Sequence, residues 1–177
     1  MITRTLLTLV VSLLLANTAL AQRDYLTPQE VDLVKEAQVI DKRIDVFIKA
    51  AERRLLVING GSAATEKLSK KEAERWGELP TGSRADLVSD IARIVDAAID
   101  NIDDVSMHDE RNPLIAKSVR KLAASVNSIM TQIKPLSAQA KSEAEIASFE
   151  QLNEGAQSIS EALAKLPPEV EKKAKKN

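Results

Sequence analysis

The stretch TPQEVDLVKEAQVIDKRIDVFIKAAERRLLVI, residues 27–58, decides the fold class, because apolar residues recur in it at helical spacing. Steps of three and four residues align this row along one side of a single long helix. The row consists of Leu33, Ala37, Ile40, Ile44, Phe47, Ala51, Leu55 and Ile58. Such a long apolar stripe must be covered by other helices. The stretch therefore predicts a helix bundle.

The start of this helix carries a specific signature. Thr27 can accept a hydrogen bond from an early backbone N–H, while Glu30 accepts one from the N–H of the cap residue, as in a capping box. Pro28 suits the first helical position, where no N–H partner is needed. Asn59-Gly60-Gly61-Ser62 tolerates positive φ and should end the helix.

Two further helices with regular apolar rows follow. Ser83 with Asp86 can cap the second, and Asn112 followed by Pro113 can start the third. The row of the second helix is Leu87, Ile91, Ile94, Ala98, Ile102 and Val105. The row of the third is Ile115, Val119, Leu122, Val126, Ile129 and Ile133. Both rows predict helices with one buried face.

A fourth helix is expected after Lys134-Pro135, because proline lacks an N–H donor and disfavours helical ψ in the residue before it. We expect it to begin near Ser137, with Gly155 marking a close crossing. Its row is Ala140, Ala144, Ala147, Leu152, Ala156, Ile159, Leu163 and Leu166. Between the first two long helices, Ser69-Lys70-Lys71-Glu72 predicts a short helix ending near Trp76. Trp76 is expected either to cover the end of the core or to form an exposed partner contact.

The predicted fold is all-α: an antiparallel four-helix bundle with a short extra helix in the first long connection, preceded by a signal peptide. Residues 1–21 carry Arg4, the apolar run Leu6 to Leu15 and the small-x-small site Ala19-Leu20-Ala21. An apolar run of about ten residues is shorter than the roughly twenty that span a bilayer, which makes a retained anchor the less favoured alternative.

Cleavage after Ala21 leaves a predicted helical bundle domain, residues 22–166, and a basic flexible tail, residues 167–177. We therefore expect a periplasmic or secreted protein without stable membrane insertion after cleavage. The chain has no Cys, so packing must provide its stability. Its 25 basic and 26 acidic residues nearly balance, and its few aromatic residues are scattered, so no nucleic-acid partner is predicted.

Catalytic motifs are missing from the sequence. His108 is the only histidine, no serine lies in a G-x-S-x-G motif, and Gly60-Gly61 lacks the lysine of a phosphate-binding loop. We therefore expect no enzymatic activity, no catalytic residue and no cofactor.

The best candidate site is the acidic end of the second helix. Asp100, Asp103, Asp104 and His108 could hold a divalent cation, and they are low-ranking candidates for a metal site. The alternative is an ion-pair cluster. Carboxylates at the C-terminus of a helix interact unfavourably with the helix dipole, and so do basic residues near the N-terminus of a helix. The second helix ends with such carboxylates and the third begins with such basic residues. Asp104 and Arg120 could therefore pair across the turn between the two helices.

The segment from Tyr25-Leu26-Thr27-Pro28-Gln29-Glu30-Val31 through Asp41-Lys42-Arg43-Ile44 to Ala51-Glu52-Arg53-Arg54-Leu55 resembles the opening of exported bacterial helical proteins of an uncharacterised family. This resemblance implies a signal peptide and a helical body. A weaker similarity is to the periplasmic Spy and CpxP chaperones, whose signature is Leu-Thr-x-x-Gln. In Leu26-Thr27-Pro28-Gln29 the glutamine comes one position earlier.

The leading functional hypothesis is a non-enzymatic envelope protein that acts through helix-surface contacts with a protein partner or with itself. We expect the contact on an uncovered part of the first helix. Its apolar residues outside the main row predict either a wide core face or a dimer seam; they are Val31, Val34, Val46 and Ile48. The alternative is a chaperone-like holdase, which needs a concave apolar surface. A divalent-metal-binding protein is less favoured.

Overall fold

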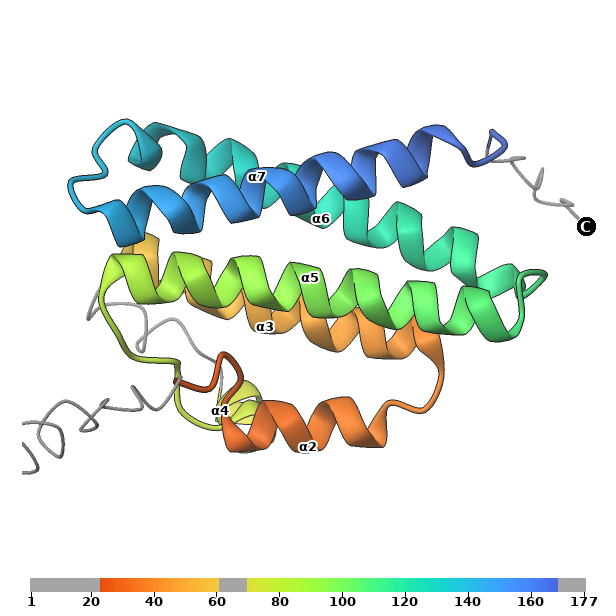
Figure 1. The fold of residues 1–177 in the computed structure, drawn as a ribbon. Coiled ribbons are helices and arrows are strands. Elements are labelled where there is room, and N and C mark those ends of the chain that lie inside the picture. Colours follow the sequence, from red (N-terminus) through yellow and green to blue (C-terminus); the bar gives the residue numbers. More distant parts are fainter. Residues whose placement is uncertain (1–22, 61–69, 169–177) are drawn as a thin grey trace, which may run out of the picture.

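A computed structural model describes residues 23–60 and 70–168. These residues form six helices and no strand (Figure 1). The helices are α2 (Pro28–Glu36), α3 (Ile40–Gly60), α4 (Lys70–Trp76), α5 (Arg84–His108), α6 (Pro113–Ser137) and α7 (Glu143–Ala164). The predicted all-α class is thereby confirmed. The predicted signal peptide, the Ser69 cap and residues 169–177 of the predicted tail lie outside the described residues.

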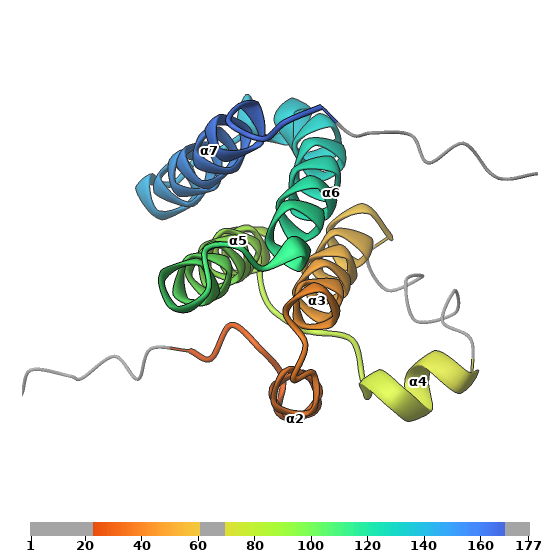
Figure 2. The same cartoon turned by 90° about the vertical axis from the view of Figure 1, so that its right-hand side faces the viewer.

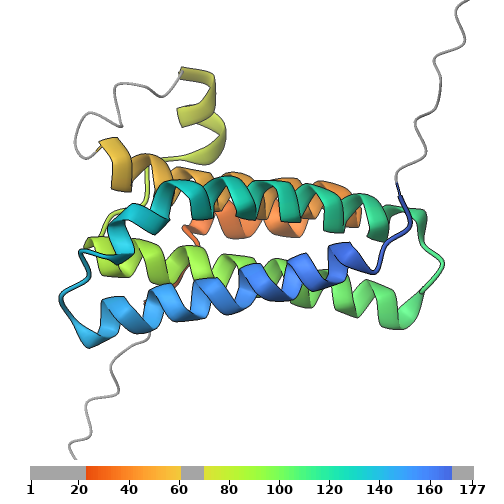
Figure 3. The same ribbon diagram turned by 90° about the horizontal axis from the view of Figure 1, so that it is seen from above.

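The bundle consists of α3, α5, α6 and α7, and successive members run in opposite directions (Figure 1). Seen end-on, α6 and α7 form one layer, α3 and α5 a second, and α2 and α4 lie on the far side of that second layer (Figure 2). From above, α6 overlies α3 and α7 overlies α5 (Figure 3). The α5–α6 connection therefore crosses the bundle diagonally. As a result, α6 runs in the same direction as α3, which it overlies, and α7 runs in the same direction as α5.

The predicted rows of α5 and α6 build most of the core. Leu87, Ile91, Ile94, Ala98 and Ile102 are buried, as are Val119, Leu122, Val126, Ile129 and Ile133. α5 also buries a second row, Val88, Ala92 and Val95. It does so because it packs against both α3 and α7. Each buried valine, leucine or isoleucine side chain stabilises the fold by about 1.5–3 kcal/mol. With buried rows against two neighbours, α5 is the central element of the core.

The prediction of one helix over residues 27–58 is wrong, because the chain breaks between α2 and α3. The predicted cap is confirmed: Glu30 Oε2 accepts from the backbone N–H of Thr27 at 2.9 Å. At the break, the Ala37 carbonyl accepts from Arg43 Nε at 2.9 Å. After the break, α3 runs back alongside α2 (Figure 1). This reversal brings Arg54 next to Glu30. In one continuous helix these two residues would lie about 36 Å apart.

The predicted short helix, α4, ends at Trp76 and is followed by Gly77 with a φ of 67°. Glycine adopts this left-handed conformation without a Cβ penalty, which suits it to end a helix. Trp76 is buried with Leu33 and Val46 in a small cluster of its own. The indole thus covers the space between α2, α3 and α4 rather than the end of the main core.

The boundary between α6 and α7 differs from the prediction. α6 continues through Pro135 to Ser137, since a proline in the last turn removes only one hydrogen bond. α7 begins at Glu143, where Ser142 Oγ accepts from the backbone N–H of Glu145 at 3.2 Å. The predicted start near Ser137 is therefore wrong, and Ser142 is the residue that caps α7.

The predicted α7 row is also wrong at two of its first three positions. Ala144 and Ala147 are exposed, whereas Glu145, Ser148 and Phe149 are buried. The alanine row could not continue into the rest of the helix, because residues five positions apart are separated by about 140° around a helix. The face that buries Phe149 is the one that continues at helical spacing into the later apolar residues.

Gly155 marks a close crossing of α7 over α5, as the sequence suggested. A Cβ atom added there would lie 3.1 Å from Val95 Cγ1 and 3.2 Å from Asp96 Oδ1. The glycine is buried, and its missing side chain lets the two helix backbones approach. This contact fixes how deeply α7 sits on α5.

Candidate functional site

The four metal candidates lie at the exposed end of α5. His108 Nδ1 is 2.7 Å from the backbone carbonyl oxygen of Asp104 and 3.6 Å from its carboxylate Oδ1. Asp100 and Asp103 are exposed and take part in no ion pair of the described chain. Across residues 23–60 and 70–168, no three His, Cys, Asp or Glu side chains gather closely enough to hold a metal ion. The structure brings together two of the four candidates.

The predicted pairing of the α5 end with the α6 start is wrong. Lys117 Nζ lies 2.6 Å from Asp41 Oδ2, and Lys121 Nζ lies 2.6 Å from Asp45 Oδ1. Both lysines therefore face α3, because α6 overlies α3 and lies diagonally from α5. The hydrogen bond from Lys117 lowers the pKa of Asp41, and the same contact raises the pKa of Lys117.

Arg120 has no carboxylate partner in the described residues. Its guanidinium donates to the backbone carbonyl oxygens of Ala116 and Pro167. Asp41, in contrast, lies in the first turn of α3, where the helix dipole favours a negative charge. Lys117 and Lys121 of α6 thus pair with the start of α3 and not with the acidic end of α5.

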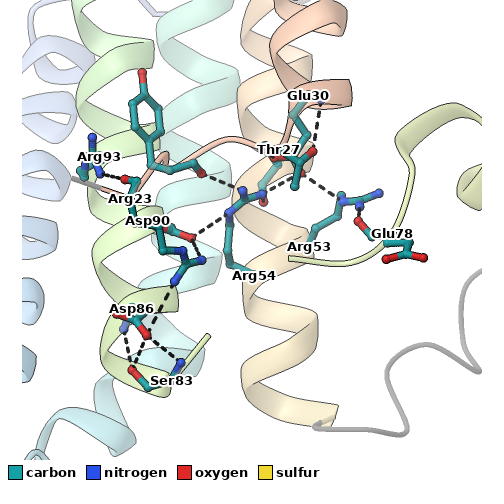
Figure 4. A network of polar contacts seen from close by, with 12 residues as sticks. Arg23, Thr27, Glu30, Arg53, Arg54, Glu78, Ser83, Asp86, Asp90 and Arg93 are labelled. Carbon is teal, nitrogen blue, oxygen red and sulfur yellow. Dashed lines mark hydrogen bonds and ion pairs between the residues drawn. The ribbon is translucent and has the colours of Figure 1, made fainter. Parts of the chain in front are cut away.

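A buried ionic network joins α2 to α3, and the sequence did not predict it. Glu30 Oε1 accepts from Arg54 Nη1 at 2.7 Å and lies 3.2 Å from Arg53 Nε (Figure 4). The three side chains are at most 2% exposed. Arg53 also donates to the carbonyl oxygens of Gly77 and Glu78. One carboxylate and two guanidinium groups therefore hold α2, α3 and the α4–α5 connection together.

The same network continues through Asp90 of α5 to the segment before α2. Asp90 Oδ2 lies 2.7 Å from Arg23 Nη2 and 3.7 Å from Arg54 Nε (Figure 4). Arg54 Nη2 also donates to the Tyr25 carbonyl oxygen at 2.7 Å. Arg93 donates to the Arg23 carbonyl oxygen at 2.8 Å, and its guanidinium carbon lies 4.5 Å from the centre of the Tyr25 ring. These contacts hold residues 23–25 against the bundle.

Burial perturbs the ionisation of this network. Removal from water raises the pKa of Asp90 to about 6, although Arg23, Arg54 and Arg93 act in the opposite direction. Burial also lowers the pKa of Arg53, against the attraction of Glu30. Among the residues that the structure describes, none accepts a hydrogen bond from Arg53 Nε, Arg53 Nη1 or Arg54 Nε. Electrostatic attraction therefore stabilises the network in addition to hydrogen bonds. Its contacts connect α2, α3, α5 and the segment before α2.

A signal for this network existed in the sequence. Arg54 continues the helical row of Phe47 and Ala50, and Asp90 lies between Leu87 and Ile94 at the same kind of spacing. Each is a charged residue inside an otherwise apolar row, and the two charges are opposite. Buried charges are stable only when paired. Two such residues on adjacent helices therefore indicate a buried contact.

A long groove lies between α6 and α7. One part has a volume of about 810 Å³ and the adjoining part about 380 Å³, and both are lined by Asn127, Met130 and Asn153. Arg120 and Leu163 lie in the first part, and Lys134 and Phe149 in the second. The remaining lining of the larger part is mostly small or amide-bearing: Ala123, Ala124, Ala156, Gln157 and Ser160. Such small residues allow another helix to approach closely.

The expected contact surface on the first helix is covered instead. Val46 is buried, and Val34 and Ile48 pack against the core as half-buried residues. The wide core face is therefore confirmed for Val34 and Ile48, whereas Val46 is covered in the separate cluster with Trp76. A smaller groove of about 500 Å³ remains between α2, α3 and α4, where Trp76 and Leu33 contribute apolar surface and Arg75 and Glu36 contribute charge.

None of the helices that the structure describes has the length and apolarity needed to cross a bilayer. Comparisons with protein-family models, with curated proteins and with solved structures give no match to this chain.

Proposed function

We propose that this is an exported, non-enzymatic helical protein that acts by binding another protein along the α6–α7 face. The groove between these helices carries the proposal. It follows two antiparallel helices, and it is lined by short side chains on an apolar floor that includes Val126 and Ile159. Helices with small residues at their contact can pack at a separation of about 8–10 Å. A helical partner fits such a groove.

The lining favours a protein partner over a small substrate. Ligand pockets are usually enclosed and have a few converging polar groups. Here the amides of Asn127, Asn153 and Gln157 are spread along the groove. Amide side chains that are distributed in this way can hydrogen-bond to a partner helix at several levels. The export part of the proposal is supported by the sequence of residues 1–21.

The holdase alternative has less support. A surface for unfolded clients needs a contiguous apolar patch. The large apolar side chains exposed in the described residues are Val39, Met107, Ile146 and Leu163. They belong to the α2–α3 turn, the end of α5 and the two ends of α7.

A comparative pull-down tests the proposal. The tagged chain and two variants are expressed in the native cell, and bound proteins are identified from envelope extract. Ala124→Arg places a bulky charge in the groove, whereas Ala73→Arg makes the same change at an exposed site of α4, on the other side of the bundle. We expect a partner that the unaltered chain and Ala73→Arg retain and Ala124→Arg loses. Identical partners for both variants, or the recovery of neither another protein nor untagged copies of this chain, would contradict the proposal.

A further inference from the structure

The two helices of the α6–α7 face carry charges of opposite sign. Within α6 the charged residues are all basic: Lys117, Arg120, Lys121 and Lys134. Within α7 they are all acidic: Glu143, Glu145, Glu150, Glu154 and Glu161. Two adjacent helices with such complete segregation can attract each other within one chain, or each can attract the opposite helix of another molecule.

Most of these charges form no ion pair within the part of the chain that the structure describes. Lys117 and Lys121 pair with α3, and Glu145 pairs with Arg84. Arg120, Lys134, Glu150, Glu154 and Glu161 form no ion pair in the described residues. Glu150, Glu154 and Glu161 follow one another at intervals of four and seven residues, which places them on a single exposed side of α7. Arg120 and Lys134 line the groove from α6.

We propose that the partner of the α6–α7 face is a second copy of this chain, related by a twofold axis parallel to the groove. This inference rests on the proposed function and names its partner. A rotation about such an axis places α6 of each copy over α7 of the other and keeps every residue at its level along the helices. Lys134 then lies level with Glu150 of the other copy, and Arg120 lies level with Glu161.

The charges also select this axis over the alternative. A twofold axis perpendicular to the helices would place α6 on α6 and α7 on α7, so that basic residues would face basic residues and acidic residues would face acidic ones. Like charges in an interface oppose association. The parallel axis forms each pair twice, because a twofold interface repeats every contact.

The area of the face is sufficient for a specific dimer. Helices of this length extend over about 35 Å, and two of them side by side are about 20 Å wide. The face therefore has an area of roughly 700 Å² per copy, and two copies would bury about 1,400 Å² in total, within the range of specific interfaces. The short side chains of Ala123, Ala124 and Ala156 leave room for the helices of the other copy.

Charge exchange at Lys134 and Glu150 tests this arrangement, with sedimentation equilibrium as the measurement. Lys134→Glu alone gives a homodimer with two Glu–Glu contacts, and Glu150→Lys alone gives one with two Lys–Lys contacts. When the two variants are mixed, both contacts become Glu–Lys pairs. We expect each variant alone to associate at least about tenfold more weakly than the unaltered chain, and the mixture to recover most of that loss.

Two controls accompany the mixture. Lys71→Glu changes an exposed lysine on α4, on the other side of the bundle, and should leave the dimer unchanged. Ala124→Arg should abolish it, and helical content measured by circular dichroism confirms that each variant folds. A monomer at every concentration, or a dimer that none of the groove substitutions weakens, would refute the second copy as the partner. The protein-binding proposal would still stand if the pull-down yields a different protein that Ala124→Arg loses.

Discussion

Glu30 and Arg54 form a buried ion pair: Glu30 Oε1 lies 2.7 Å from Arg54 Nη1, and both side chains are at most 1% exposed. Breaking a buried pair leaves the remaining charge without compensation, which costs about 3–5 kcal/mol. The adjacent Arg53 increases the effect, since it lies 3.2 Å from the same oxygen. The attachment of α2 to the bundle therefore depends on one carboxylate.

Replacing Glu30 with Gln should lower the free energy of unfolding by about 3 kcal/mol, because two buried guanidinium groups lose their common counter-charge. Asp32→Asn on the same helix is the matched control. It removes an exposed pair with Lys35, which is worth less than about 1 kcal/mol. Urea unfolding followed by circular dichroism measures both. Equal, small effects of the two substitutions would show that the network does not hold α2.

Stability should rise as the pH falls from about 6 to about 4. The pKa of Asp90 is about 6 in the folded chain, compared with about 3.9 when unfolded, so the folded state binds the proton more tightly in this window. A shift of about two units corresponds to roughly 3 kcal/mol. Asp90→Asn should remove the rise. Urea unfolding at a series of pH values tests this, and a flat profile for the unaltered chain would contradict it.

Below about pH 4 the free energy of unfolding should fall again, because three other carboxyl groups have lowered pKa values in the folded chain. Hydrogen bonds from Lys117, Ser83 and Arg84 lower the pKa values of Asp41, Asp86 and Glu145, respectively. A carboxyl group with a lowered pKa stabilises the fold above its unfolded pKa and loses that contribution as it is protonated. The same unfolding series should therefore show a maximum near pH 4–5, and Asp90→Asn should retain this acid limb.

The ion pairs between α3 and α6 should couple energetically. Single charge reversals at Asp45 and Lys121 should each destabilise the fold, and the double reversal should recover about 0.5–1 kcal/mol, as expected for a partly exposed pair. The same cycle at Asp104 and Arg120 should be additive, because these residues do not pair in the described structure. Coupling in the second cycle and none in the first would indicate a different helix arrangement.

Gly155→Leu should destabilise the fold by about 2 kcal/mol, because a side chain at the α5–α7 crossing must displace Val95 or Asp96. Ala147→Leu adds a side chain at an exposed position of the same helix and should change stability by less than about 0.5 kcal/mol. Thermal unfolding distinguishes the two. Tolerance of leucine at Gly155 would show that α7 does not sit as closely on α5 as the structure indicates.

The sequence by itself determined the helical class, the long amphipathic rows and several caps. Thr27 with Glu30, and Ser83 with Asp86, cap their helices as expected. These features depend on residues within one or two turns of each other, so local spacing is sufficient to predict them. The row from Val119 to Ile133 is buried for the same reason.

Only the tertiary structure decided the break after Glu36, the buried network and the pairing of Lys117 and Lys121 with α3. No proline or glycine marks the break. It is stabilised by contacts such as Glu30 with Arg54, between residues that are far apart along the chain. The lysine partners depend on the diagonal α5–α6 connection, which places α6 over α3 (Figure 3). Local spacing indicates which side of a helix is apolar, but the neighbour that covers it is chosen by packing of the whole chain.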